Sequence, residues 1–284
     1  MRGPEASLRG PKPIGRWVGA WACGVGVFAV VALIFGSQAA PDGFQVASAP
    51  GAWVRLVGLL LAAAAAGALV PLVAAHDLPG LAASAVGVGL VVVAQIGRSL
   101  MTAPTVRPGD YWIYVVAETA AAALALAVAY AASSAIVERV VGVERREVWR
   151  RQVRVGGRRS ERTPAASIFL AMGAGVIVAF ALAYALNGGK PGEGLGAACA
   201  AVTALLAALL MHRAAPIRDS LWFALSVPLW TVLLPGIGWI IAEATGDPVL
   251  PLTVAMASVG ASPFAFCGAG VAGAMVGFWI TYKG

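Results

Sequence analysis

The chain has 284 residues, of which 60% are hydrophobic and 12% are charged, and its formal net charge is +7. A water-soluble domain is about half apolar and about a quarter charged, so this composition excludes most soluble folds and predicts a polytopic membrane protein. The positive charge does not indicate nucleic-acid binding. Most of it lies in the N-terminal tail and in one central loop between apolar runs, as in membrane proteins, and no nucleic-acid-binding signature accompanies it.

Eight segments are apolar enough to cross a bilayer as helices. A spanning helix needs about 20 apolar residues, because each residue rises about 1.5 Å across a hydrocarbon core about 30 Å thick. The predicted spans are 17–37, 53–75, 80–101, 111–136, 165–187, 194–212, 220–242 and 252–280. The predicted fold class is therefore all-α, a polytopic transmembrane helix bundle of about eight spans.

The first and last spans each allow more than one interpretation. The first ends in GSQAAP, which could be a signal-peptide cleavage site, but its apolar core exceeds the usual length of about 7–15 residues, which favours an uncleaved anchor. The region 249–280 is too long for one straight span and contains Pro251 and Pro263. One tilted helix, one kinked helix, or a surface or re-entrant piece followed by a span would all fit.

The distribution of basic residues predicts the orientation. With eight spans and the N-terminus inside, sixteen of the twenty Lys and Arg residues face the cytoplasm, and only Arg55, Arg98, Arg107 and Lys190 lie on the outer side. This asymmetry places both termini in the cytoplasm. Arg outnumbers Lys by 17 to 3, which is typical of a GC-rich bacterial genome, so the predicted location is the inner membrane.

The same distribution divides the chain into four parts. They are a basic cytoplasmic tail (1–16), a first four-span half (17–136), an Arg-rich cytoplasmic loop (137–164) and a second four-span half (165–284). Both halves begin on the inner side, as parallel repeats do. Their only matching residues are a GD pair at 109–110 and another at 246–247, which is too little to establish a duplication.

The loop 137–164 contains nine arginines and four acidic residues. Its beginning could continue the fourth helix into the cytoplasm as far as Gly156 and Gly157. The simplest interpretation is a stop-transfer loop that contacts anionic lipid headgroups. A docking surface for an acidic protein partner is the alternative.

Glu118 is the strongest candidate for a functional residue. If the fourth span begins near Tyr111, Glu118 lies roughly 10 Å into the bilayer, where an ionised group costs on the order of 3 kcal/mol. The carboxyl group is therefore either neutral or opposite a cation. Arg98, at the end of the preceding span, is the nearest cation in sequence, and Gln95 shares its face and could supply a hydrogen bond.

Three alanines follow Glu118 on roughly the same helical face, namely Ala121, Ala122 and Ala125. Small side chains let another helix approach, so we expect the carboxylate to point into protein rather than lipid. It either locks two helices together or handles a proton or cation during transport.

Two further patterns concern helix geometry. Pro228, Pro235, Gly236 and Gly238 interrupt the seventh span, and they predict either a simple kink or the broken helix of a transporter. Ala265, Ala269, Gly273 and Gly277 recur every four residues in the last span, a spacing that favours close helix packing within the chain over a homodimer interface.

No pattern of residues indicates a cofactor, a metal or a known catalytic set. Cys23, Cys199 and Cys267 lie in apolar runs without metal-ligand spacing, and the two histidines stand far apart. The sequence therefore favours a structural, accessory or assembly subunit that packs by its helices, with possible partner subunits. A small permease that uses Glu118 is the alternative, and an intramembrane enzyme has the least support.

Overall fold

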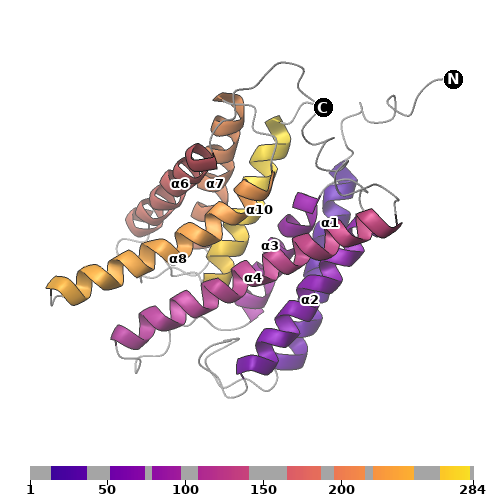
Figure 1. Ribbon diagram of the computed structural model, residues 1–284, viewed down its shortest axis with the longest axis horizontal. Coiled ribbons are helices and arrows are strands. Elements are labelled where there is room, and N and C mark those ends of the chain that lie inside the picture. The colour runs from indigo at the N-terminus through magenta and orange to yellow at the C-terminus, as the bar shows by residue number, and fades with distance from the viewer. Residues whose placement is uncertain are drawn as a thin grey trace.

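The computed structural model describes residues 14–36, 52–73, 79–96, 108–140, 165–186, 195–214, 220–245 and 263–281, which form eight α-helices without any strand in these ranges. Figure 1 shows their arrangement: α1 (Ile14–Gly36), α2 (Ala52–Val73), α3 (Pro79–Ile96), α4 (Pro108–Val140), α6 (Ala165–Leu186), α7 (Leu195–Ala214), α8 (Ser220–Thr245) and α10 (Pro263–Thr281). The predicted all-α helix bundle is confirmed.

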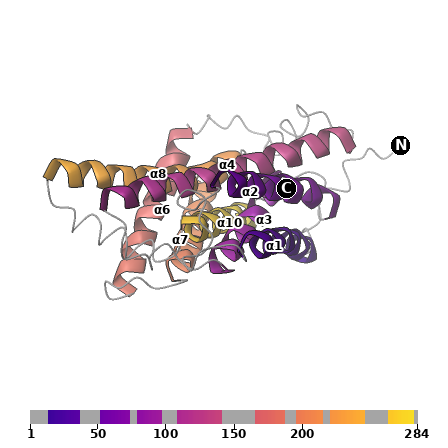
Figure 2. The same cartoon turned by 90° about the horizontal axis from the view of Figure 1, so that it is seen from below.

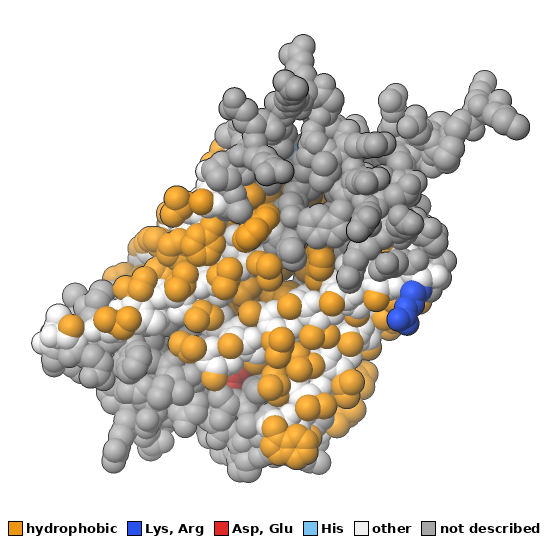
Figure 3. Space-filling model, in the orientation of Figure 1, with side chains coloured by type: hydrophobic (Ala, Val, Ile, Leu, Met, Phe, Trp, Pro, Cys, Tyr) orange, Lys and Arg blue, Asp and Glu red, His pale blue; other side chains and the backbone are white. Residues whose placement is uncertain are grey.

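Six of the described helices are long and apolar enough to cross a membrane, namely α1, α2, α4, α6, α7 and α10. The continuous apolar segments described in α3 and α8 are shorter, Gly80–Ala94 and Trp222–Leu234. The six helices indicate a multi-pass membrane protein. Figure 3 agrees with this, because apolar side chains cover most of the described surface on the face that it shows.

Two predicted spans differ from the observed helices. The fourth was expected at 111–136, but α4 runs from Pro108 to Val140, and its 33 residues are about 50 Å long, well above the thickness of a hydrocarbon core. The last was expected at 252–280; the described helix α10 runs from Pro263 to Thr281, and residues 252–262 lie outside the described residues. Proline is favoured at the first position of a helix, where no N–H is needed. Pro251 lies outside the described residues.

Helix α10 occupies the centre of the bundle. It packs against α7, α3, α8 and α4, and 78% of its membrane-spanning segment is buried inside the protein, compared with 22% for α1. Figure 2 shows α10 and α3 between the remaining helices. The large buried side chains around α10 include its own Phe264, Phe266 and Phe278.

Aromatic contacts show that α1 begins and α10 ends at the same end of the bundle. The rings of Trp17 and Trp279 meet edge to face, with centroids 6.0 Å apart. Trp21 donates a 2.9 Å hydrogen bond from Nε1 to the hydroxyl of Ser84, near the start of α3. Helices α1 and α3 therefore start at the end of the bundle where α10 finishes. A chain that crosses an even number of times, with both termini on one side, requires these directions. Which side is cytoplasmic stays a prediction.

The first helix is an integral member of the bundle. Phe28 of α1 is fully buried, and a Cβ placed on Gly24 would overlap the backbone of Ala85 in α3. An uncleaved first helix would need packing of this kind. The possible cleavage motif GSQAAP begins at Gly36, where the described helix ends, and its other residues lie outside the described residues.

Candidate functional site

Glu118 lies in the first third of α4 and is fully buried, as is the adjacent Thr119. On the side of α4 that follows Glu118, Ala121, Ala122 and Ala125 are between 0% and 5% exposed. The carboxylate therefore points into protein and not into lipid. Its position satisfies the physical requirement that an ionisable group at membrane depth should face the bundle interior.

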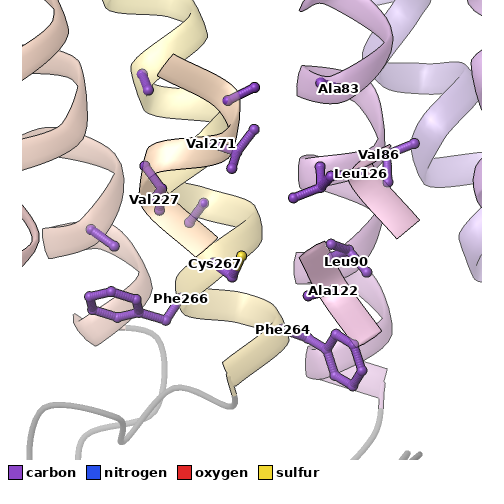
Figure 4. Close-up of a cluster of buried hydrophobic side chains, with 14 of the residues drawn as sticks. Ala83, Val86, Leu90, Ala122, Leu126, Val227, Phe264, Phe266, Cys267 and Val271 are labelled. Atoms are coloured by element: carbon purple, nitrogen blue, oxygen red, sulfur yellow. The ribbon is translucent and has the colours of Figure 1, made fainter. Parts of the chain in front are cut away.

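Glu118 lies on a helix with four neighbours, because α4 packs against α2, α3, α8 and α10. Helices α3, α4 and α10 contact one another in all pairs. Figure 4 draws Ala122, one helical turn after Glu118, in the same buried cluster as Leu90 of α3 and Phe264 of α10. A side chain on this face of α4 is thus surrounded by helices from both halves of the chain.

The two residues predicted to accompany Glu118 are not placed. Arg98 lies outside the described residues, and Gln95 belongs to the last turn of α3 but its side chain is not described. Helices α3 and α4 do pack against each other. An interaction of Glu118 with Arg98 and Gln95 therefore stays a prediction.

Arg55 is a buried charge that the sequence did not reveal. Counting basic residues assigned Arg55 to the outer surface, but it is only 7% exposed in α2. Its face continues through Leu59, Ala66 and Val70, all of which are buried. This helical spacing is the signal that could have identified Arg55 as an interior residue, because residues three or four apart share one face.

Arg55 and Glu118 stand at similar distances along their helices from a contact between α2 and α4. A Cβ on Gly67 of α2 would overlap the backbone of Ala129 in α4, so the two helices touch there. Arg55 precedes Gly67 by twelve residues and Glu118 precedes Ala129 by eleven. The predicted eight crossings give α2 and α4 the same direction, and each side chain is about 17 Å along its helix from that contact.

The predicted break in the seventh span does not interrupt the helix. Helix α8 is a single α-helix from Ser220 to Thr245, past Pro228 and Pro235. Pro228 is buried, and a Cβ added to Gly236 would meet no atom within 4 Å, whereas the side-chain environments of Pro235 and Gly238 are not described. The described backbone of α8 is therefore a continuous, proline-containing helix, and the choice between a simple kink and a transporter's broken helix stays a prediction.

The four-residue repeat of α10 lies on a buried helix face. Ala265 and Ala269 are 0% and 9% exposed, and a Cβ on Gly273 or Gly277 would overlap the backbone of Ala201 or Leu205 in α7. In the structure, α7 is thus the helix that the two glycines approach, and the contact is made within one chain.

Several described hydroxyl groups in the interior bond to their own helix. Thr203 donates to the carbonyl oxygen of Cys199 at 2.8 Å, and Thr231 donates to that of Val227 at 2.8 Å. Ser134 makes the same contact with Tyr130 at 2.9 Å. Such bonds satisfy a hydroxyl within a helix without creating a site for a ligand.

Within the described residues, no group of three or more His, Cys, Asp or Glu side chains is placed to hold a metal ion. Cys199 and Cys267 are buried, and Cys23 is partly buried. Comparison of the chain with protein-family models, with curated proteins and with solved structures gives no significant match in any of the three.

Proposed function

We propose that this chain is a structural or assembly subunit of a membrane protein complex, located in the inner membrane of a bacterium. The observation that best supports the proposal is the close packing around α10. Helix backbones approach each other directly at Gly87 and Gly268, at Gly273 and Ala201, and at Gly277 and Leu205. In lipid, such contacts replace the hydrophobic effect as the force that joins helices, and they favour a rigid body.

The polar side chains of the interior agree with this role. Thr203, Thr231 and Ser134 bond to their own helices, and Trp230 donates from Nε1 to the carbonyl oxygen of Phe169 at 2.7 Å, which ties α8 to α6. The three hydroxyl groups are thus satisfied within their own helices, and the Trp230 indole joins two helices. A solute pathway would instead present several polar groups toward a common space.

The periphery offers apolar helix faces on which partner helices could pack. On α8, Leu229, Leu233, Ile237 and Ile240 are 43% to 62% exposed and lie along one side of the helix. We also propose that the Arg-rich loop 137–164 contacts anionic lipid headgroups, or an acidic partner in the second interpretation. Arg139, in the last turn of α4, is exposed at the start of this loop.

Purification in a mild detergent tests the proposed role. A tagged chain isolated from its native membrane is expected to bring down other membrane subunits in fixed ratio. A variant with alanine at Leu229, Leu233 and Ile237 probes the α8 face. Alanine at three exposed residues of α1, namely Val18, Val30 and Leu33, is the matched control. A chain that purifies alone from membranes of its own cell would contradict the proposal.

A small permease is the second candidate, and the burial of Glu118 favours it specifically. The residue is on α4, a helix that contacts α2 and α3 of the first half and α8 and α10 of the second, and a carboxylate at such a position could couple proton binding to movement. Proteoliposomes that contain the purified chain test this idea. Proton uptake driven by a pH gradient should disappear in Glu118→Gln and persist in Glu118→Asp; equal activity of all three proteins would exclude a coupling carboxylate.

A further inference from the structure

We infer that α1 to α4 and α6 to α10 are two copies of one four-helix fold, related by an approximate two-fold axis, and that the surface between them is an interface between two four-helix units. This inference does not depend on the proposed function. It assigns α1 to α6, α2 to α7, α3 to α8 and α4 to α10 as equivalent helices. The partner that each unit fits is a second unit of the same fold.

The contacts inside each unit follow the same pattern. In the first unit, α1 packs against α2 and α3, and α4 packs against α2 and α3. In the second unit, α6 packs against α7 and α8, and α10 packs against α7 and α8. The contact between α2 and α3 is the exception, because α7 and α8 make no contact of comparable extent. Figures 1 and 2 place α1 and α2 at one side of the molecule and α6 and α7 at the other.

The contacts between the units indicate the two-fold relation. Helix α3 of the first unit packs against α10 of the second. The equivalent of α3 is α8 and the equivalent of α10 is α4, and these two helices also pack against each other. Helix α4 also contacts its own equivalent α10, and α3 contacts its own equivalent α8. A two-fold axis requires this pattern, because every contact from the first unit to the second is repeated by the equivalent contact from the second unit to the first. Units stacked one after another, as in a solenoid, would contact through different helices on each side.

The directions of the helices agree with parallel repeats. Phe180, in the second half of α6, stacks on Phe266 at the start of α10, with ring centroids 4.7 Å apart. Trp17, at the start of α1, meets Trp279 near the end of α10. Both α1 and α6 therefore start at the end of the bundle where α10 finishes, so an axis that relates them runs along the membrane normal. Parallel repeats in membrane proteins have this axis.

The α3–α10 contact is the tightest described point of the interface. A Cβ on Gly87 would lie 2.6 Å from the carbonyl oxygen of Gly268, and a Cβ on Gly268 would overlap the carbonyl of Gly87. Only glycine at both positions lets the two backbones touch. A larger residue at Gly268 would therefore separate the units, while the nearby α7–α10 contact at Gly273 lies inside one unit.

A nicked full-length chain tests the interface. A protease site is placed between Gly156 and Gly157 in the loop that joins the units, and the purified protein is cleaved in mild detergent. We expect the two fragments to elute together in equal amounts. Gly268→Leu should release the first unit from the second after cleavage, and Gly268→Ala should do so in part. Gly236→Leu is the matched control in the second unit, because nothing lies within 4 Å of its Cβ position. Fragments that separate without any substitution, or that stay together in Gly268→Leu, would overturn the interface.

A permuted chain tests the repeat relation itself and remains informative if Gly268→Leu does not fold. Residues 165–284 are placed first, followed by 141–164 and then 1–140. Equivalent parallel units predict that this chain inserts into the membrane and elutes as a monodisperse protein with a melting temperature close to that of the original. A permuted chain that is inserted but aggregates in detergent would contradict the two-fold relation.

Discussion

The spanning segments of α1 and α10, Trp17–Ile34 and Pro263–Ile280, are both apolar, but they occupy opposite environments. The spanning segment of α10 is 78% buried and that of α1 is 22% buried, although α1 is the more hydropathic of the two. Helix α10 contains Gly268, Gly270, Gly273 and Gly277 at its contacts with α3, α8 and α7. Helix α1 instead exposes Val18, Val30, Leu33 and Ile34.

The comparison shows that hydropathy does not decide which helix is central when the solvent is lipid. Lipid tails are as apolar as leucine, so a leucine-rich helix gains little by leaving them. A helix with small residues on several faces gains dispersion contacts and backbone proximity with several neighbours at once. The interior position of α10 agrees with the glycines at its contacts with α3, α7 and α8.

The largest expected effect is that of a reversed charge in the interior. Glu118→Lys places a cation where the protein buries a carboxylate, and an uncompensated buried charge costs several kcal/mol, on the order of 3–5 kcal/mol. We expect little or no monodisperse protein in detergent from this variant, whereas Glu118→Gln should fold. Size-exclusion profiles of the two variants, at matched expression, measure the difference. A normal profile for Glu118→Lys would show that the site tolerates a cation.

A leucine on the central helix should be much more damaging than one on the peripheral helix. Gly273→Leu in α10 must displace the backbone of Ala201, whereas a side chain at Gly26 in α1 meets no atom within 4 Å of its Cβ. Overpacking of this kind costs about 1–3 kcal/mol or more. Thermal unfolding in detergent should show a clear loss for Gly273→Leu and almost none for Gly26→Leu. Equal losses would contradict the difference between the two helices.

Truncation of a large side chain should also distinguish the two helices. Met275 of α10 is fully buried, and Leu33 of α1 is 68% exposed. Met275→Ala should lower the free energy of unfolding by about 2–5 kcal/mol because it leaves a cavity. Leu33→Ala should have a smaller effect, because lipid fills the space of the removed atoms. Reversible unfolding in mixed micelles measures both. A larger loss for Leu33→Ala would indicate that this face of α1 is covered by another protein.

A smaller effect is expected where one hydrogen bond joins two helices. Trp230→Phe keeps a ring that can stack on Phe169, as the indole does with centroids 4.9 Å apart, but it removes the Nε1 donor to the Phe169 carbonyl. The loss should be about 1–2 kcal/mol, since the ring contact is retained. The control variant is Trp222→Phe, at a position that is 38% exposed. Equal changes in melting temperature in the two variants would mean that the hydrogen bond does not stabilise the protein.

The sequence predicted the helices well because length and apolarity are strong constraints in a bilayer. The depth of Glu118 and the alanines beside it likewise predicted a buried carboxylate, because charge at that depth must face protein. The sequence did not predict which helices meet, since glycines such as Gly273 and Gly87 favour close contact with any helix. Arg55 was missed because a basic residue two positions after Trp53 resembles an interfacial charge. Its helical spacing from other buried residues of α2 could have identified it, namely Leu59, Ala66 and Val70.

The end of α4 shows that a helix and its membrane span can end at different residues, as the expected continuation of the fourth helix into the basic loop implied. Apolarity alone ended the fourth span at 136, but the helix continues through Glu138 and Arg139 to Val140. A helix does not need to stop where the hydrocarbon ends, because its backbone hydrogen bonds are internal and charged side chains reach water. Span limits and helix limits are therefore separate quantities.

The threading of the chain through the membrane is the claim on which the rest depends, and labelling of single cysteines in intact cells tests it most directly. In a chain without its three native cysteines, positions in 37–51, 97–107, 187–194 and 246–262 should react with an impermeant maleimide from outside. Positions in 74–78, 141–164 and 215–219 and at both termini should react only after permeabilisation. Labelling of 97–107 and 74–78 from the same side would mean that α3 does not cross, and eight crossings would then be wrong.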